Sequence, residues 1–211
     1  MRTVTKTFNV YKYSELSPEA KEEANRWYLD DPIRPQLFQE TVEEELKDMF
    51  DRDDLAIQFS IGAHQGSGLN IYGRVSADSI IALLDKENLR EPLENLKGLL
   101  TDKEKKTILS YGAECSDIGL RYNSRYCYSL AQYIDFSNDW EAELYDAEFE
   151  TVDMTLVEKF ERFVRMLFEK LNSHYEELGY KYFYEPDEEE IEDSCEDNNW
   201  EFLEDGRFYI D

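Results

Sequence analysis

Met154–Leu178 reads MTLVEKFERFVRMLFEKLNSHYEEL, a stretch whose apolar residues recur at gaps of one, three and four. These gaps place the apolar side chains on one broad stripe of an α-helix. Thr151 or Asp153 is a suitable N-cap, and Gly179 predicts the end of the helix. Such a stripe needs a covering surface from the rest of the chain. The stripe consists of Leu156, Val157, Phe160, Phe163, Val164, Leu167, Phe168, Leu171, Tyr175 and Leu178.

Two acidic blocks flank this predicted helix. Residues 126–158 contain nine Asp and Glu and no Lys or Arg, and residues 185–205 contain twelve acids and again no base. Together the blocks hold 21 of the 49 carboxylates of a chain whose formal net charge is −26. Self-repulsion at this charge opposes the compact state, so the clustering calls for an explanation.

The composition predicts a folded protein. Of the 211 residues, 41% are hydrophobic and 14% aromatic, whereas disordered acidic chains are poor in aromatic residues. This length predicts one domain, residues 1–211, with a real core. The alternative that the acidic helix and hairpin at 185–211 form an appendage stays open.

Periodicity predicts several further elements. Alternation over Arg2–Tyr13 indicates an N-terminal strand, and Ser17 before Pro18 indicates a helix that ends near Asp30. The fold class predicted is α+β: an antiparallel sheet with helices packed on one face and one long amphipathic helix in the C-terminal half. Further helices are expected at 36–51, 77–86, 93–100, 101–111 and 186–197, and strands at 56–61, 69–75, 120–122, 126–130, 133–136, 200–203 and 207–210.

Cysteine usage and hydropathy indicate the compartment. Cys115, Cys127 and Cys195 are odd in number and form no CxxC motif, which is typical of a reducing cytoplasm. We see no apolar signal region and no run approaching eighteen apolar residues, so we expect a soluble protein of the cytoplasm. Nucleic acid and anionic membranes are polyanions and are disfavoured as direct partners, whereas a basic protein surface is favoured.

Short motifs resemble a known set of proteins. They are YSELSPEAK at 13–21, FSI at 59–61 running into QGSG at 65–68, and NNWEFLEDG at 198–206. They resemble small acidic proteins of phages and conjugative elements, which share an ELSxEAK helix, a QGDG hairpin and an NxYEFxEDG ending. Ser67 stands where those proteins carry an acid. The resemblance implies a mobile-element accessory protein, antitoxin-like or acting against host defence, and identifies no site.

Nothing in the sequence singles out catalytic chemistry. His64 lies in a Gly-rich connection whose spacing matches neither the Rossmann nor the P-loop pattern, and His174 falls on the long helix. Cys115 and Cys127 have no base that the sequence pairs with them. We therefore predict no enzyme, no cofactor and no metal site. An enzyme that uses His64 on nucleic acid is kept as a third hypothesis.

The acidic blocks carry the leading hypothesis. Duplex DNA presents one charge per ~1.7 Å of axis, so half of the net charge on one face matches roughly 20 Å of duplex. The alternative interpretation is that these acids form a solvated face with no binding role. The predicted partner-binding residues are Asp135, Asp139, Glu141, Glu143, Asp146, Glu148, Glu150, Asp187, Glu188, Glu189, Glu190, Glu192, Asp193, Glu196 and Asp197.

We therefore expect a mobile-element inhibitor that acts as an acidic nucleic-acid mimic in the cytoplasm of a bacterial host cell. Its partner is expected to be a host protein with a basic nucleic-acid-binding cleft, either a CRISPR effector or a restriction enzyme, which makes the chain anti-CRISPR or anti-restriction. The alternative is an antitoxin-like or regulatory module that sequesters a basic partner, with oligomerisation through the long helix left open.

Overall fold

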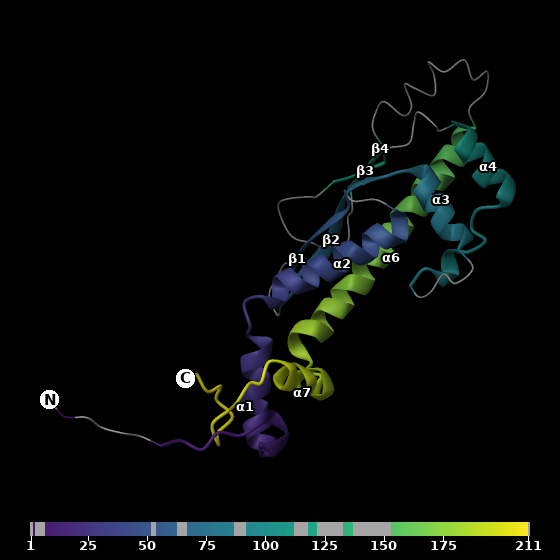
Figure 1. The fold of residues 1–211 in the computed structure, drawn as a ribbon. Helices are drawn as coiled ribbons and strands as arrows, with labels where there is room; N and C mark the ends of the chain where they lie inside the picture. The colour runs from purple at the N-terminus through teal and green to yellow at the C-terminus, as the bar shows by residue number, and fades with distance from the viewer. Residues whose placement is uncertain are drawn as a thin grey trace. The chain divides into compact units, whose positions relative to one another are not determined.

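The computed structural model describes residues 2, 7–51, 54–62, 67–86, 92–111, 118–121, 133–136 and 153–210 (Figure 1). Two compact units divide the chain. Unit 1 comprises residues 1–38 and 180–211, and unit 2 comprises residues 39–179. The elements are η1 (Tyr13–Glu15), α1 (Pro18–Leu29), α2 (Arg34–Phe50), β1 (Ala56–Ser60), β2 (Gly68–Val75), α3 (Ala77–Asp85), η2 (Glu94–Leu96), α4 (Asp102–Tyr111), β3 (Ile118–Arg121), β4 (Tyr133–Phe136), α6 (Met154–Tyr184) and α7 (Glu188–Asp197).

Unit 2 is built on an antiparallel sheet of order β1-β2-β3-β4. Ile57 on β1 faces Ile71 on β2, and both side chains are buried. Glu43 of α2 accepts a hydrogen bond from the Ile57 amide (3.1 Å), and Asn172 of α6 accepts one from the Ile71 amide (3.0 Å). These bonds fix both helices against the sheet, and the predicted α+β class is confirmed.

The long helix α6 contributes many of the buried side chains of the unit 2 core. Nine of the ten predicted stripe residues are buried, and the exception is Leu178, at 37% exposed. Phe168 stacks on Phe50 of α2, with ring centroids 5.5 Å apart. Asp153 is confirmed as the cap, because its carboxylate accepts from the amides of Thr155 and Leu156 at 3.1 and 3.2 Å. Thr151 lies outside the described residues.

The predicted stop at Gly179 is wrong, because α6 continues to Tyr184. A glycine inside a helix costs about 1 kcal/mol relative to alanine. The following turn offsets that cost by packing in unit 1, where the rings of Tyr182 and Phe183 lie 5.5 and 5.3 Å from the ring of Phe38. Tertiary contact thus overrides the local stop signal.

Two other element predictions are corrected. Within the predicted N-terminal strand, residues 7–10 form no strand and Tyr11 makes a single bridge with Phe202, while residues 3–6 lie outside the described residues. The helix expected at 93–100 is only the 3₁₀ turn η2. The strand expected at 126–130 lies outside the described residues.

Unit 1 packs its helices on a small β arrangement. Phe202 forms bridges with both Tyr11 and Phe208, so three chain segments lie side by side. The predicted cap of Ser17 on α1 is confirmed, because its hydroxyl accepts from the Ala20 amide at 3.3 Å. Residues 185–211 share this unit with the N-terminal segment. The single-domain expectation stays a prediction.

Candidate protein-binding surface

The acidic helix α7 begins at a well-formed cap. The Asp187 carboxylate accepts hydrogen bonds from the amides of Glu189 (3.1 Å) and Glu190 (3.2 Å), which satisfies donors that the first turn leaves unpaired. Three glutamates, 188–190, fill that first turn, where the partial positive charge of the helix N-terminus stabilises carboxylates. The local sequence therefore favours a helix here despite the repulsion among its acids.

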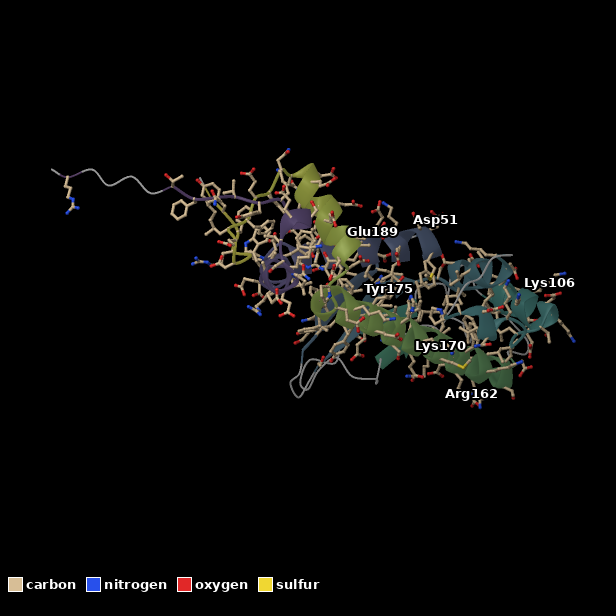
Figure 2. The ribbon with its side chains drawn as sticks, turned by 90° about the horizontal axis from the view of Figure 1, so that it is seen from below. Asp51, Lys106, Arg162, Lys170, Tyr175 and Glu189 are labelled. Carbon is tan, nitrogen blue, oxygen red and sulfur yellow. The ribbon has the colours of Figure 1, made fainter. Side chains whose placement is uncertain are left out.

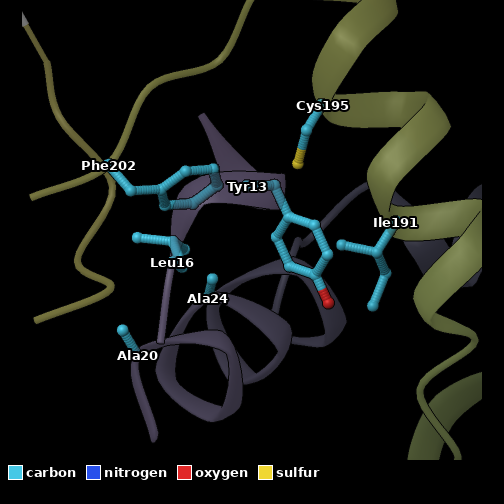
Figure 3. Close-up of a cluster of buried hydrophobic side chains, with 7 residues drawn as sticks. All are labelled: Tyr13, Leu16, Ala20, Ala24, Ile191, Cys195 and Phe202. Atoms are coloured by element: carbon cyan, nitrogen blue, oxygen red, sulfur yellow. The ribbon is translucent and has the colours of Figure 1, made fainter. Parts of the chain in front are cut away.

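One seam of α7 is buried in unit 1. Ile191 and Cys195 are one helical turn apart and are 1% and 2% exposed. They join a core cluster with Tyr13 and Phe202, which Figure 3 shows together with residues of α1. Burial, reinforced by the nearby Glu192 charge, raises the pKa of the Cys195 thiol to about 11, so this cysteine is an apolar anchor rather than a nucleophile.

Basic side chains hold both flanks of that seam. Lys21 of α1 lies 3.9 Å from the Glu188 carboxylate on one side. On the other side, the Arg34 guanidinium lies 3.7 Å from the Glu190 carboxylate. The Tyr28 hydroxyl also donates to Glu190, at 3.0 Å. The negative charges of Glu188 and Glu190, which flank the seam, are thus partly compensated within unit 1.

Arg34 is the most deeply buried of these cations, at 5% exposed. Its guanidinium lies over the rings of Tyr28 (4.8 Å) and Tyr182 (3.9 Å), and one of its NH₂ groups donates to the Tyr182 carbonyl. Its Nε has no hydrogen-bond partner among the described residues. A buried guanidinium is stabilised here by two aromatic faces, a carbonyl and one carboxylate.

The remaining acids of α7 point away from the unit. An α-helix turns about 100° per residue, so five acids fall on an arc of about 140° opposite the Ile191–Cys195 seam. We call this set the free acidic arc: Glu189, Glu192, Asp193, Glu196 and Asp197. All are exposed except Glu192, which is half-buried. Figure 2 labels Glu189 among the oxygen-tipped side chains of this helix.

The structure describes nine of the fifteen predicted partner-binding residues. The eight at 187–197 lie together on α7 or at its cap. Asp135 lies on β4, opposite Gly119 of β3, and the other six, at 139–150, lie outside the described residues. The prediction that both blocks contribute to one surface therefore stays a prediction.

Sequence reasoning missed the cations that orient α7. Nothing local marks Lys21 or Arg34, because their role depends on the carboxylates of Glu188 and Glu190 and on Tyr182, all more than 140 residues away. The i, i+4 spacing of Ile191 and Cys195 within an otherwise acidic run was the available signal for the buried seam.

The histidines define no site. His64 lies outside the described residues. His174 is half-buried and borders an open groove of about 660 Å³ on α6, together with Lys170, Glu169 and Glu177. No group of three or more His, Cys, Asp or Glu among the described residues is placed to hold a metal ion. Within the same residues, no helix has the length and apolar character needed to cross a membrane.

Comparisons with protein-family models, curated proteins and solved structures found no match to this chain. The function is therefore argued from the residues themselves.

Proposed function

We propose that this protein is a non-enzymatic inhibitor whose free acidic arc enters a basic, nucleic-acid-binding cleft of another protein. The partner class is a host defence nuclease, a CRISPR effector or a restriction enzyme, and the inhibitor is carried by a mobile element. It acts in the cytoplasm of the bacterial host cell. The observation that carries the proposal is that α7 presents five carboxylates on the side opposite its anchored seam.

The spacing of the arc supports mimicry of a polynucleotide. With a rise of 1.5 Å per residue, Glu189 to Asp197 spans about 12 Å, which gives a mean spacing of about 3 Å of axis between successive carboxylates. A nucleic-acid duplex carries one charge per ~1.7 Å of axis and a single strand one per ~3.4 Å. The linear charge density of the arc thus lies between those of one strand and two.

The wider charge distribution supports the same partner. Unit 1 contains eight Lys and Arg against 19 Asp and Glu, a net charge of −11 in the smaller of the two units. A field of this sign accelerates encounter with a basic surface and disfavours other polyanions. Binding should be fast and should weaken as salt rises.

A pull-down from host lysate tests the proposal. The full chain is immobilised and the captured proteins are identified with and without excess duplex DNA. We expect a nucleic-acid-binding protein that excess DNA displaces. Capture that DNA leaves unchanged contradicts the proposal, and capture of one small basic protein favours the antitoxin-like alternative instead.

A further inference from the structure

One face of the β arrangement in unit 1 carries exposed apolar side chains beside charged ones. Phe202 is fully buried, and half-buried Tyr11 and Phe208 pair with it in the same row. Side chains alternate between the two faces of extended chain, so Val10, Leu203 and Tyr209 point to the opposite face. Phe8 belongs there too, because its ring lies 6.5 Å from the ring of Tyr209. We call these four residues the outer β face.

The outer β face combines exposed and half-buried apolar side chains in one place. Phe8 is 55% exposed and Val10 is 36% exposed, while Leu203 and Tyr209 are half-buried. Clustered exposed apolar residues rimmed by polar groups are typical of protein–protein contact sites. The rim here contains two ion pairs, Lys12 with Glu201 (3.9 Å) and Arg207 with Asp205 (2.9 Å).

The charge of the unit identifies the occupant. A second copy of the chain would bring two units of net charge −11 together, and an anionic membrane or a polynucleotide would meet the same repulsion. A basic protein segment with apolar side chains satisfies both the charge and the exposed rings.

We infer that the outer β face docks a basic, apolar-anchored segment of the protein partner. The inference rests on the proposed function for the sign of the partner's charge, and it adds a second contact that supplies apolar burial. Aromatic anchors concentrate interface energy, whereas exposed charges mainly set encounter rate and specificity. In this proposal the outer β face supplies interface energy, and the free acidic arc supplies encounter rate and specificity.

Two synthetic peptides test the inference on the full chain. One alternates Lys and Leu over ten residues, and the other alternates Lys and Ser and so carries the same charge. We expect the Lys–Leu peptide to bind roughly tenfold more tightly, because burying the exposed parts of a Phe and a Val is worth about one factor of ten. The amide signals of Val10, Leu203 and Tyr209 should shift only with the Lys–Leu peptide.

Matched variants assign that difference to the outer β face. The double variant Phe8→Ser with Val10→Ser should bind both peptides equally. The control, Ile33→Ser with Leu37→Ser, removes two side chains of similar exposure (49% and 43%), one from the turn before α2 and one from its first turns, and should keep the tenfold preference. Unchanged tryptophan fluorescence verifies that each variant is folded.

The outcomes separate the two proposals. Equal binding of the two peptides to the unaltered protein overturns the docking inference and leaves the acidic mimic standing. Failure of both peptides to bind even at low salt contradicts the acidic mimic as well. A dimer that sedimentation detects in the protein alone, and that the Phe8→Ser, Val10→Ser variant loses, assigns the face to a second copy and overturns the inference.

Discussion

The two β regions of this chain differ in what covers them. In unit 2, Leu69 and Ile71 are 1% and 0% exposed beneath α2 and α6. In unit 1, one face of the β arrangement packs on α1 and α7, while Phe8 and Val10 on the other face are 55% and 36% exposed. The apolar residues left exposed on unit 1 are the reason for proposing that unit 1 provides the contact with a partner.

The largest expected effect comes from Gly206. It holds φ +84°, and a Cβ there would lie 2.0 Å from the Ala20 carbonyl oxygen of α1. We expect Gly206→Ala to destabilise unit 1 by about 3 kcal/mol or more, because a strained backbone and a steric clash add together. Urea unfolding followed by fluorescence of Trp27 and Trp200 measures this change.

Gly98→Ala is the matched control. Gly98 has the same φ of +84°, but no atom lies within 4 Å of the added Cβ. The backbone penalty alone should cost about 1 kcal/mol. Equal losses for the two variants would show that the contact of Gly206 with α1 contributes nothing to unit 1.

Arg34 gives the next largest effect. Arg34→Met removes the guanidinium from between Tyr28 and Tyr182 and leaves Glu190 without that cation. We expect about 2 kcal/mol of destabilisation, together with faster amide hydrogen exchange in α7, because cation–π and charged contacts are lost at a buried site.

Arg26→Gln serves as the control for Arg34, because the Arg26–Glu23 pair is exposed. Such a pair contributes about 0–1 kcal/mol. If Arg34→Met leaves amide hydrogen exchange in α7 unaltered, the anchoring role of Arg34 is contradicted.

The smallest effect concerns alkaline pH. Burial, above all, raises the pKa of Tyr13 to about 12 from an ordinary value of 10.0, so the hydroxyl stays neutral in the fold while the unfolded chain ionises. The corresponding stability is complete below pH 10 and is lost as the pH rises towards 12. Tyr13→Phe should flatten the decline in stability of unit 1 over this interval. If the stability of the Tyr13→Phe variant declines as steeply as that of the unaltered chain, Tyr13 is not the cause of the decline.

Local signals predicted the helices and caps well. Ser17 caps α1 as predicted, and Asp153, one of the two predicted candidates, caps α6, because capping depends on residues within one turn. The apolar stripe of α6 was predictable for the same reason, since periodicity is carried by adjacent turns.

The failures share a physical cause. The continuation of α6 through Gly179 depends on Phe38, and the role of Arg34 depends on Tyr182 and Glu190. The alternation before Tyr11 predicts an extended chain but not its pairing, which requires a partner strand. Contacts between residues far apart in the sequence decide all three, and local periodicity does not reveal such contacts.

The central claim is that the position of the acids on α7, rather than the net charge, gives inhibition. Two triple variants with the same change in charge test it. One neutralises three of the five acids of the free acidic arc through Glu189→Gln, Asp193→Asn and Glu196→Gln. The other neutralises three acids of similar spacing on α2 through Glu40→Gln, Glu44→Gln and Asp48→Asn.

The measurement is the concentration of each variant that displaces labelled duplex DNA from the captured partner. We predict that the α7 variant needs at least about tenfold more protein, whereas the α2 variant stays within about twofold of the unaltered chain. Equal losses in the two variants, or full inhibition by the α7 variant, would contradict the account.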